Sequence, residues 1–175
     1  MLPTSGTTTF KAGWNSVEDL LQYTQEVSLR VDSTTEVVVD ASLAGRIGFD
    51  EGRAVVRVAG VRLDESDPAL PVCDVEIHFD ALFNGIVEDI PTATVPIAEL
   101  IEARYRVSIE TIRQEISACE LPAESAARLD ADAGTPALRI RRWYHDADRR
   151  MFQTTCSLYP AERFTYVMDL GRGTG

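Results

Sequence analysis

Hydrophobic and polar residues alternate most clearly in the last third of the chain. Two such runs cover residues 137–145 and 150–159, and the polar turn Asp146-Ala147-Asp148-Arg149 joins them. A third, shorter run covers residues 164–170. Alternation with a period of two is typical of β-strands that are buried on one face. The three runs therefore predict an antiparallel meander.

The second run has two chemically different faces. One face carries Phe152, Thr154, Cys156 and Leu158, and the other carries Gln153, Thr155, Ser157 and Tyr159. The second face is polar or amphipathic throughout. Two interpretations remain open for it: it faces water, or it forms the wall of a pocket whose hydrogen-bonding groups orient a small molecule.

The same pattern analysis predicts four further strands and four helices. We expect strands over residues 29–40, 54–63, 70–79 and 109–120, and helices over residues 17–26, 41–47, 97–106 and 122–129. We expect residues 54–63 and 70–79 to form a hairpin, and residues 80–90 to be irregular with one helical turn. Strands that mainly follow one another by hairpins predict an α+β fold with about six mostly antiparallel strands and flanking helices.

The 175 residues are enough for one well-buried domain. We expect a flexible leader or linker remnant over residues 1–12, the domain over residues 13–171, and a tail over residues 172–175. Seventeen Lys and Arg residues against 28 Asp and Glu residues give a net charge of −11. Because such a field repels a polyanion, direct binding of nucleic acid by this chain is not expected.

The sequence contains no pattern for a metal or a cofactor. Cys73, Cys119 and Cys156 are far apart, and the only histidines are His78 and His145. Three buried, reduced thiols are expected, which fits a reducing compartment. There is no apolar run of membrane-spanning length and no signal-peptide pattern, so we expect a cytoplasmic protein without membrane contact.

The C-terminal third resembles a known family. Pro136, a hydrophobic R-x-x-Y/W strand, a D-x-x-R turn and the motif S-L-Y-x-x-x-R-F that begins at Ser157 are similar to the end of the UTRA domain. That domain is the effector-binding half of GntR-type transcriptional regulators of the HutC subfamily, and it shares its fold with chorismate lyase. The resemblance extends from about Trp14 to Leu170.

The resemblance implies a homodimer that senses a small molecule, and we expect this effector to be an anionic organic acid. DNA would be bound only through a separate winged helix-turn-helix domain that precedes this one. The resemblance implies Asn15, Ser16 and Arg62 as effector-binding residues, and the polar face of the second run adds Gln153, Ser157 and Tyr159 as candidates. Asn15 and Ser16 precede the first predicted helix, whose N-terminus would present free N–H groups to an anion.

Two positions depart from the family pattern. The strand that commonly ends in Arg-x-Arg reads Gly60-Val61-Arg62 here, which predicts a roomier and less cationic site suited to a carboxylate. Relatives usually carry glycine where Arg106 stands, so the end of that helix is expected to be built differently.

Two other functions stay open at this stage. An enzyme resembling chorismate lyase would need a paired cationic grip on two carboxylates and a general acid, and a single Arg62 beside Gly60 speaks against it. No nucleophile with a neighbouring base is recognisable, so we expect no enzyme. A ligand-free dimerisation module would use an exposed sheet edge or an apolar face. The effector itself is not predictable from the sequence.

Overall fold

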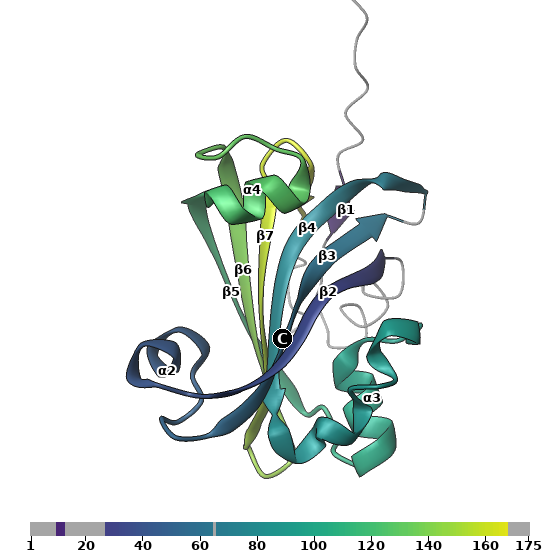
Figure 1. Cartoon of the computed structure of the whole chain (residues 1–175), viewed down its shortest axis with the longest axis vertical. Helices are drawn as coiled ribbons and strands as arrows, with labels where there is room; N and C mark the ends of the chain where they lie inside the picture. Colours follow the sequence, from purple (N-terminus) through teal and green to yellow (C-terminus); the bar gives the residue numbers. More distant parts are fainter. Residues whose placement is uncertain (1–9, 13–26, 65, 168–175) are drawn as a thin grey trace, which may run out of the picture.

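The computed structural model describes residues 10–12, 27–64 and 66–167 (Figure 1). Its centre is a six-stranded sheet in which every neighbouring pair is antiparallel. In spatial order the strands are β2 (Val27–Val38), β3 (Ala54–Asp64), β4 (Asp67–Asp80), β7 (Met151–Pro160), β6 (Pro136–His145) and β5 (Thr111–Glu120). The predicted α+β class and the six antiparallel strands are confirmed.

The sheet consists of two three-stranded units that meet where β4 pairs with β7. The hairpins predicted between β3 and β4 and between β6 and β7 are confirmed, whereas α2 (Ala41–Ile47) lies between β2 and β3 in the chain and α4 (Ala123–Leu129) lies between β5 and β6. The two units splay apart towards the end of the sheet that carries α4 and come together near the opposite end (Figure 1). The sheet is therefore strongly twisted.

The sequence also predicted α2 (Ala41–Ile47) with its correct bounds. The Asp40 side chain accepts a hydrogen bond from the Leu43 N–H (2.7 Å), and Gly48 ends the helix with φ of 83°. An N-terminal acidic cap and a glycine in the left-handed region are strong boundary signals. Local chemistry alone therefore fixes this element.

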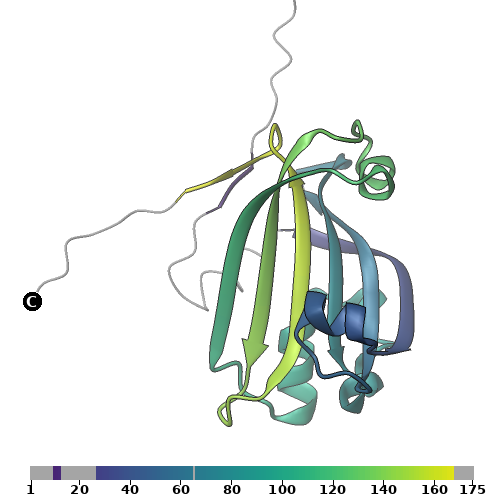
Figure 2. The same ribbon diagram turned by 90° about the vertical axis from the view of Figure 1, so that its left-hand side faces the viewer.

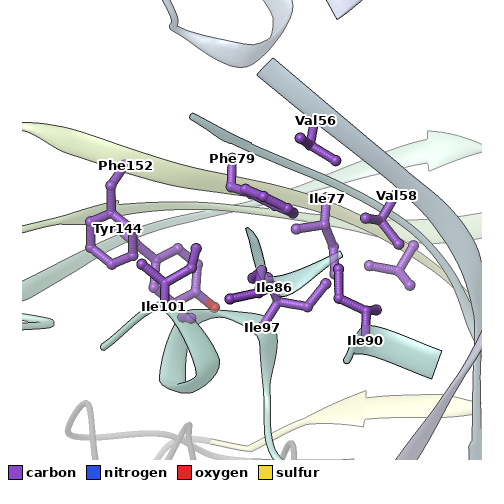
Figure 3. Packing of buried hydrophobic residues seen from close by; sticks show 12 residues of the cluster. Val56, Val58, Ile77, Phe79, Ile86, Ile90, Ile97, Ile101, Tyr144 and Phe152 are labelled. Carbon is purple, nitrogen blue, oxygen red and sulfur yellow. The ribbon is translucent and has the colours of Figure 1, made fainter. Parts of the chain in front are cut away.

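Two faces of the sheet are distinguished below. The inner face is defined by Arg62, Ile77 and Thr155, and the outer face by Arg57, His78 and Thr154. The inner face packs against three short helical elements, η1 (Ala81–Ile86), η2 (Ile90–Thr92) and α3 (Ile97–Tyr105). Figure 3 shows Ile77 and Phe79 of the sheet pointing towards Ile86 and Ile97 in this core. Turned by 90°, the molecule shows α4 at one end of the curved sheet and α2 nearer the other (Figure 2).

The third predicted strand does not continue the meander. β8 (Phe164–Tyr166) leaves the main sheet and pairs in parallel with β1 (Phe10–Ala12), which lies within the predicted leader. The reason is Arg163, whose buried guanidinium donates hydrogen bonds to the carbonyls of Pro71 (3.2 Å), Leu129 (2.5 Å) and Asp130 (2.9 Å). These three bonds hold the turn after β7 against β4 and α4, so the chain is directed away from β7.

Phe152 also differs from the prediction. The pairing of β6 with β7 shifts between Tyr144 and His145, so Phe152 is an extra residue in the ladder. A β-bulge of this kind interrupts the strict alternation of faces. Phe152 therefore packs with Tyr144 in the core beneath α3, with ring centroids 6.3 Å apart. The rest of the predicted alternation in β7 is correct.

Candidate functional site

The polar row of β7 is buried. Gln153, Thr155, Ser157 and Tyr159 are each at most 4% exposed. The water-facing interpretation of this row is therefore wrong. Among the described residues, Gln153 Oε1 and Thr155 Oγ1 have no hydrogen-bond partner. Because a buried polar atom without a partner costs about 1–3 kcal/mol, such atoms are characteristic of sites that hold water or a ligand.

Arg62 lies on the same face of the sheet, two strands away from this row. It is 9% exposed and lines a cleft of about 130 Å³. The other lining residues come from β2, β4 and the segment that leads into α3; they are Val27, Ser28, Leu29, Ile77, Ile90, Ala93, Thr94, Val95, Pro96 and Ile97. The cleft thus combines one buried guanidinium with mainly apolar walls. Because drug-sized ligands occupy about 300 Å³ or more, this cleft suits a small molecule with one anionic group.

The strand register shows which predicted residues lie close together. Arg62 pairs with Cys73 of β4. Continuing the register between β4 and β7 places Tyr159 beside Cys73, so the three residues lie on one line across the sheet. At the usual strand spacing, the backbones of Arg62 and Tyr159 are about 10 Å apart. Ser157 is one row further along the sheet. These three predicted residues share one end of the inner face.

Gln153 lies at the other end of the row. It is six residues from Tyr159 along an extended strand, which corresponds to about 20 Å. Its neighbour on β4 is Phe79, within the core beneath η1 and α3. A small molecule that contacts Arg62 and Tyr159 would therefore reach Gln153 only across Thr155. Asn15 and Ser16 lie outside the described residues.

Sequence reasoning missed Arg142 as a component of this face. Alternation along β6 places it on the same face as Ile140 and Tyr144. Arg142 is 3% exposed, and its Nε donates a 2.7 Å hydrogen bond to Gln114 Oε1 of β5. The alternating spacing of Ile140, Arg142 and Tyr144 was the signal that would have assigned it to the inner face.

Cys73 is the fully buried thiol between Arg62 and Tyr159. Burial raises the pKa of the Cys73 thiol to about 11, although the nearby Arg62 guanidinium acts in the opposite direction. The thiol is therefore protonated at neutral pH and contributes a small, weakly polar surface to the site. All three cysteines are free, and Cys119 and Cys156 are half-buried rather than fully buried as predicted. In the described part of the chain, no cluster of three potential metal ligands occurs.

Gly60 does not make the site roomier. A Cβ atom added to Gly60 would overlap the carbonyl oxygen of Arg30 in β2. The backbone of β2 fills the space that a side chain would take, next to a shift in pairing between Val31 and Ser33. The sequence interpretation is therefore wrong on this point: glycine is required here for the close approach of two strands.

A comparison with protein families gives a match to the UTRA domain over residues 22–165, which is most of the chain. The chain belongs to the UTRA domain family. The inner face of this UTRA domain, with its buried polar row and Arg62, lies entirely within the matched region.

Solved structures with the same fold are similar to the UTRA domain at low sequence identity. The effector domain of PhnF from Mycobacterium smegmatis matches with a TM-score of 0.75 at 21% identity, covering 93% of this chain and all of that one. The C-terminal domain of Yurk from Bacillus subtilis matches with a TM-score of 0.72 at 12% identity, covering 92% and 99%. A GntR-family transcriptional regulator from Bacillus cereus matches with a TM-score of 0.68 at 15% identity, covering 83% and 99%.

Within the described part of the UTRA domain, no helix has the length and apolarity needed to span a membrane.

Proposed function

We propose that this UTRA domain is the sensing domain of a dimeric GntR-type transcriptional regulator of the HutC subfamily, and that its effector is a small organic acid. Two of the similar solved structures support the regulatory role, since one is described as an effector domain and another as a GntR-family regulator. DNA would be bound by a separate winged helix-turn-helix domain.

The observation that carries this proposal is the buried Arg62 at the cleft. A guanidinium that is 9% exposed and lies among apolar side chains interacts strongly with a carboxylate that displaces water from it. Tyr159 and Ser157, on the same end of the inner face, would provide hydrogen-bonding groups for the remainder of the effector. Asn15, Ser16 and Gln153 remain candidates for contacts to larger effectors.

The expected mechanism is a shift between two dimer states. An effector changes DNA binding only if its affinity for the two states differs. The inner face suits such a role because it joins both three-stranded units of the sheet through β4 and β7. A ligand that contacts Arg62 on β3 and Tyr159 on β7 would fix the angle between these units.

The test is a thermal-shift screen of the purified UTRA domain against carboxylates, imidazole derivatives, sugar phosphates and chorismate, followed by calorimetric titration of any hit. A ligand at a hundred times its Kd stabilises the fold by about 2.7 kcal/mol. We expect Arg62→Ala to weaken a carboxylate hit by about 2 kcal/mol, or roughly thirtyfold in Kd.

Arg57→Ala is the matched control, because Arg57 lies on the same strand with its side chain on the outer face, paired with Glu76. It should leave the affinity unchanged. Unchanged binding by Arg62→Ala would remove Arg62 from the site, and turnover of chorismate would replace the sensing role by an enzymatic one.

A further inference from the structure

Three large side chains form a row on the outer face of β6. Arg139, Arg141 and Trp143 alternate along this strand and share the face of Thr154, and all three are half-buried. The helix α4 covers the outer face at one end of the sheet and α2 covers it nearer the other. Between them no described helix lies over β6 (Figure 2). These three residues are called the outer stripe below.

The two arginines of the outer stripe form no salt bridge within the described chain. The nearest carboxylates in the ladder are those of Glu115 on β5 and, beyond Cys156, of Glu76 on β4. Glu115 is bound by Arg113 at 2.6 Å, and Glu76 is bound by Arg57 at 2.8 Å. Two adjacent guanidinium groups that share no carboxylate, in a chain with a net charge of −11, suit an anion with more than one charge.

Arg141 lies beside a thiol that small molecules can reach. Its ladder partner on β7 is Cys156, which is half-buried. Burial raises the pKa of the Cys156 thiol, and the charge of Arg141 and a hydrogen bond with its side chain act in the opposite direction. The Arg141 guanidinium is therefore directed along the sheet towards β7, and Cys156 can report on what binds there.

Trp143 adds an aromatic surface at one end of the outer stripe. Its indole N–H donates a 3.2 Å hydrogen bond to the Ile47 carbonyl of α2, which fixes the plane of the ring. The central carbon of the Arg113 guanidinium lies over the ring, 5.6 Å from its centroid, and the Arg113 side chain is 71% exposed. Because stacked planar groups lie about 3.4 Å apart, a third planar ring would fit between them after an outward movement of Arg113 by about 1 Å.

The order of these groups corresponds to that of base, sugar and phosphates in a nucleotide. The spacing of a β-strand separates the backbone of Trp143 from that of Arg141 by about 7 Å and from that of Arg139 by about 14 Å. Sheet surfaces that bind nucleotides commonly combine aromatic side chains, which stack on bases, with basic side chains that bind phosphate.

We propose that the outer stripe binds a nucleoside di- or triphosphate, with the base between Trp143 and Arg113 and the phosphates on Arg141 and Arg139. This site lies on the opposite face of the sheet from Arg62, so it does not depend on the proposed effector site. A nucleotide places all its phosphates beside the two arginines. The further phosphates of a nucleic acid would instead lie against a protein surface of net negative charge.

Tryptophan fluorescence measures this binding directly. The chain has two tryptophans, so a Trp14→Phe background leaves Trp143 as the only emitter. We expect ATP and GTP to quench its emission saturably. The affinity should fall in the order triphosphate, diphosphate, monophosphate and nucleoside, because contacts between phosphate and guanidinium are lost in turn. Inorganic pyrophosphate should bind about tenfold more weakly than ADP, because it cannot stack on the indole.

Substitutions separate the site from general attraction to charge. In the same background, Arg139→Gln and Arg141→Gln should each raise the Kd for ATP about tenfold. The matched control is Arg150→Gln, which removes an exposed arginine just before β7 and outside the outer stripe. That variant and Arg62→Ala should leave the Kd unchanged. Equal weakening by Arg141→Gln and Arg150→Gln would overturn the site, as would an absence of quenching at millimolar ATP.

Alkylation of Cys156 locates the ligand independently. In a Cys119→Ser variant the remaining thiols are the half-buried Cys156 and the fully buried Cys73. ATP at a hundred times its Kd should slow the reaction of Cys156 with iodoacetamide about tenfold or more, measured by mass spectrometry of the peptides. Arg141→Gln should abolish this protection at the same ATP concentration. Quenching of Trp143 without protection of Cys156 would place the phosphates elsewhere and overturn the proposal.

Discussion

At the scale of single residues, some positions occupied by residues other than glycine have the backbone conformation that glycine prefers. Arg106, Asp130 and Arg149 have φ values of 56°, 50° and 62°, in the left-handed region that glycine prefers. Arg106 ends α3 with its N–H bonded to the Glu102 carbonyl at 2.9 Å. The helix therefore ends in the conformation that a glycine would adopt there, and the expectation of a different construction is wrong. Arg106 thus has the left-handed backbone conformation, although this conformation is strained for a residue with a side chain.

We expect Arg106→Gly to stabilise the fold by about 0.5–1 kcal/mol. Removing the left-handed strain gains about 1–2 kcal/mol, and the greater freedom of glycine in the unfolded chain offsets part of it. Urea denaturation at neutral pH measures the difference. Ala103→Gly, within the same helix, is the control and should instead destabilise by about 1 kcal/mol. Loss of stability in Arg106→Gly would show that the arginine side chain holds the helix end.

At the scale of elements, the contact between β2 and β3 depends on Gly60. The β2 backbone passes so close to Gly60 that no side chain fits between the strands. This contact positions the edge strand that forms one wall of the Arg62 cleft, since Leu29 of β2 pairs with Arg62. A side chain at position 60 would push β2 outward and open the cleft.

Gly60→Ala should therefore destabilise the fold by about 3 kcal/mol, at the upper end of the range for overpacking, because a backbone atom must move. Gly45→Ala is the matched control: Gly45 lies within α2, where an added Cβ meets nothing within 4 Å. That change should stabilise by about 0.5–1 kcal/mol. Thermal unfolding of the two variants beside the unmodified chain decides the matter, and equal melting temperatures would contradict the close approach.

The elements and the two hairpin pairings were largely predictable, but the pairings between segments far apart in the chain were not. Alternation and capping defined α2 and the central strands because those signals are local, as at Asp40 and Gly48. The pairing of β4 with β7 and the departure of β8 depend on contacts between distant residues, such as Arg163 with Pro71. The same distinction applies to the site. Periodicity identified the polar row, whereas the role of Gly60 depends on a backbone atom thirty residues earlier.

At the scale of the whole molecule, a few polar contacts join the layers. Arg128 of α4 donates two hydrogen bonds, of 2.9 and 2.7 Å, to the buried carboxylate of Asp74 on β4.

Near the other end of the outer face, His78 is 2% exposed and close to Arg57 and Glu76. Burial lowers the pKa of His78 to about 4, and the Glu76 carboxylate opposes this only in part. The histidine is therefore neutral at physiological pH, so its 3.6 Å contact with Glu76 is not an ion pair there.

The stability of the domain should consequently fall as the solution becomes acidic. Between the unfolded pKa of about 6.5 and the folded pKa of about 4, the unfolded chain binds a proton at His78 that the folded chain does not. We expect a loss of about 1 kcal/mol between pH 7.5 and 5.5 from this group. Urea denaturation at the two pH values measures it, and His78→Gln should reduce the difference. An unchanged pH dependence in His78→Gln would assign the effect to other groups.

The parallel pair of β1 and β8 has a consequence for the order of folding. Phe10 and Phe164 are register partners although more than 150 residues separate them in the chain. Closing so long a loop is entropically unfavourable, and the pair returns only three residues of ladder for it. This pairing is therefore expected to form after the hairpins, whose strands are close in sequence. Because β8 directly follows the turn that Arg163 anchors, we expect β7 and this turn to be in place before the N-terminal strand pairs with β8.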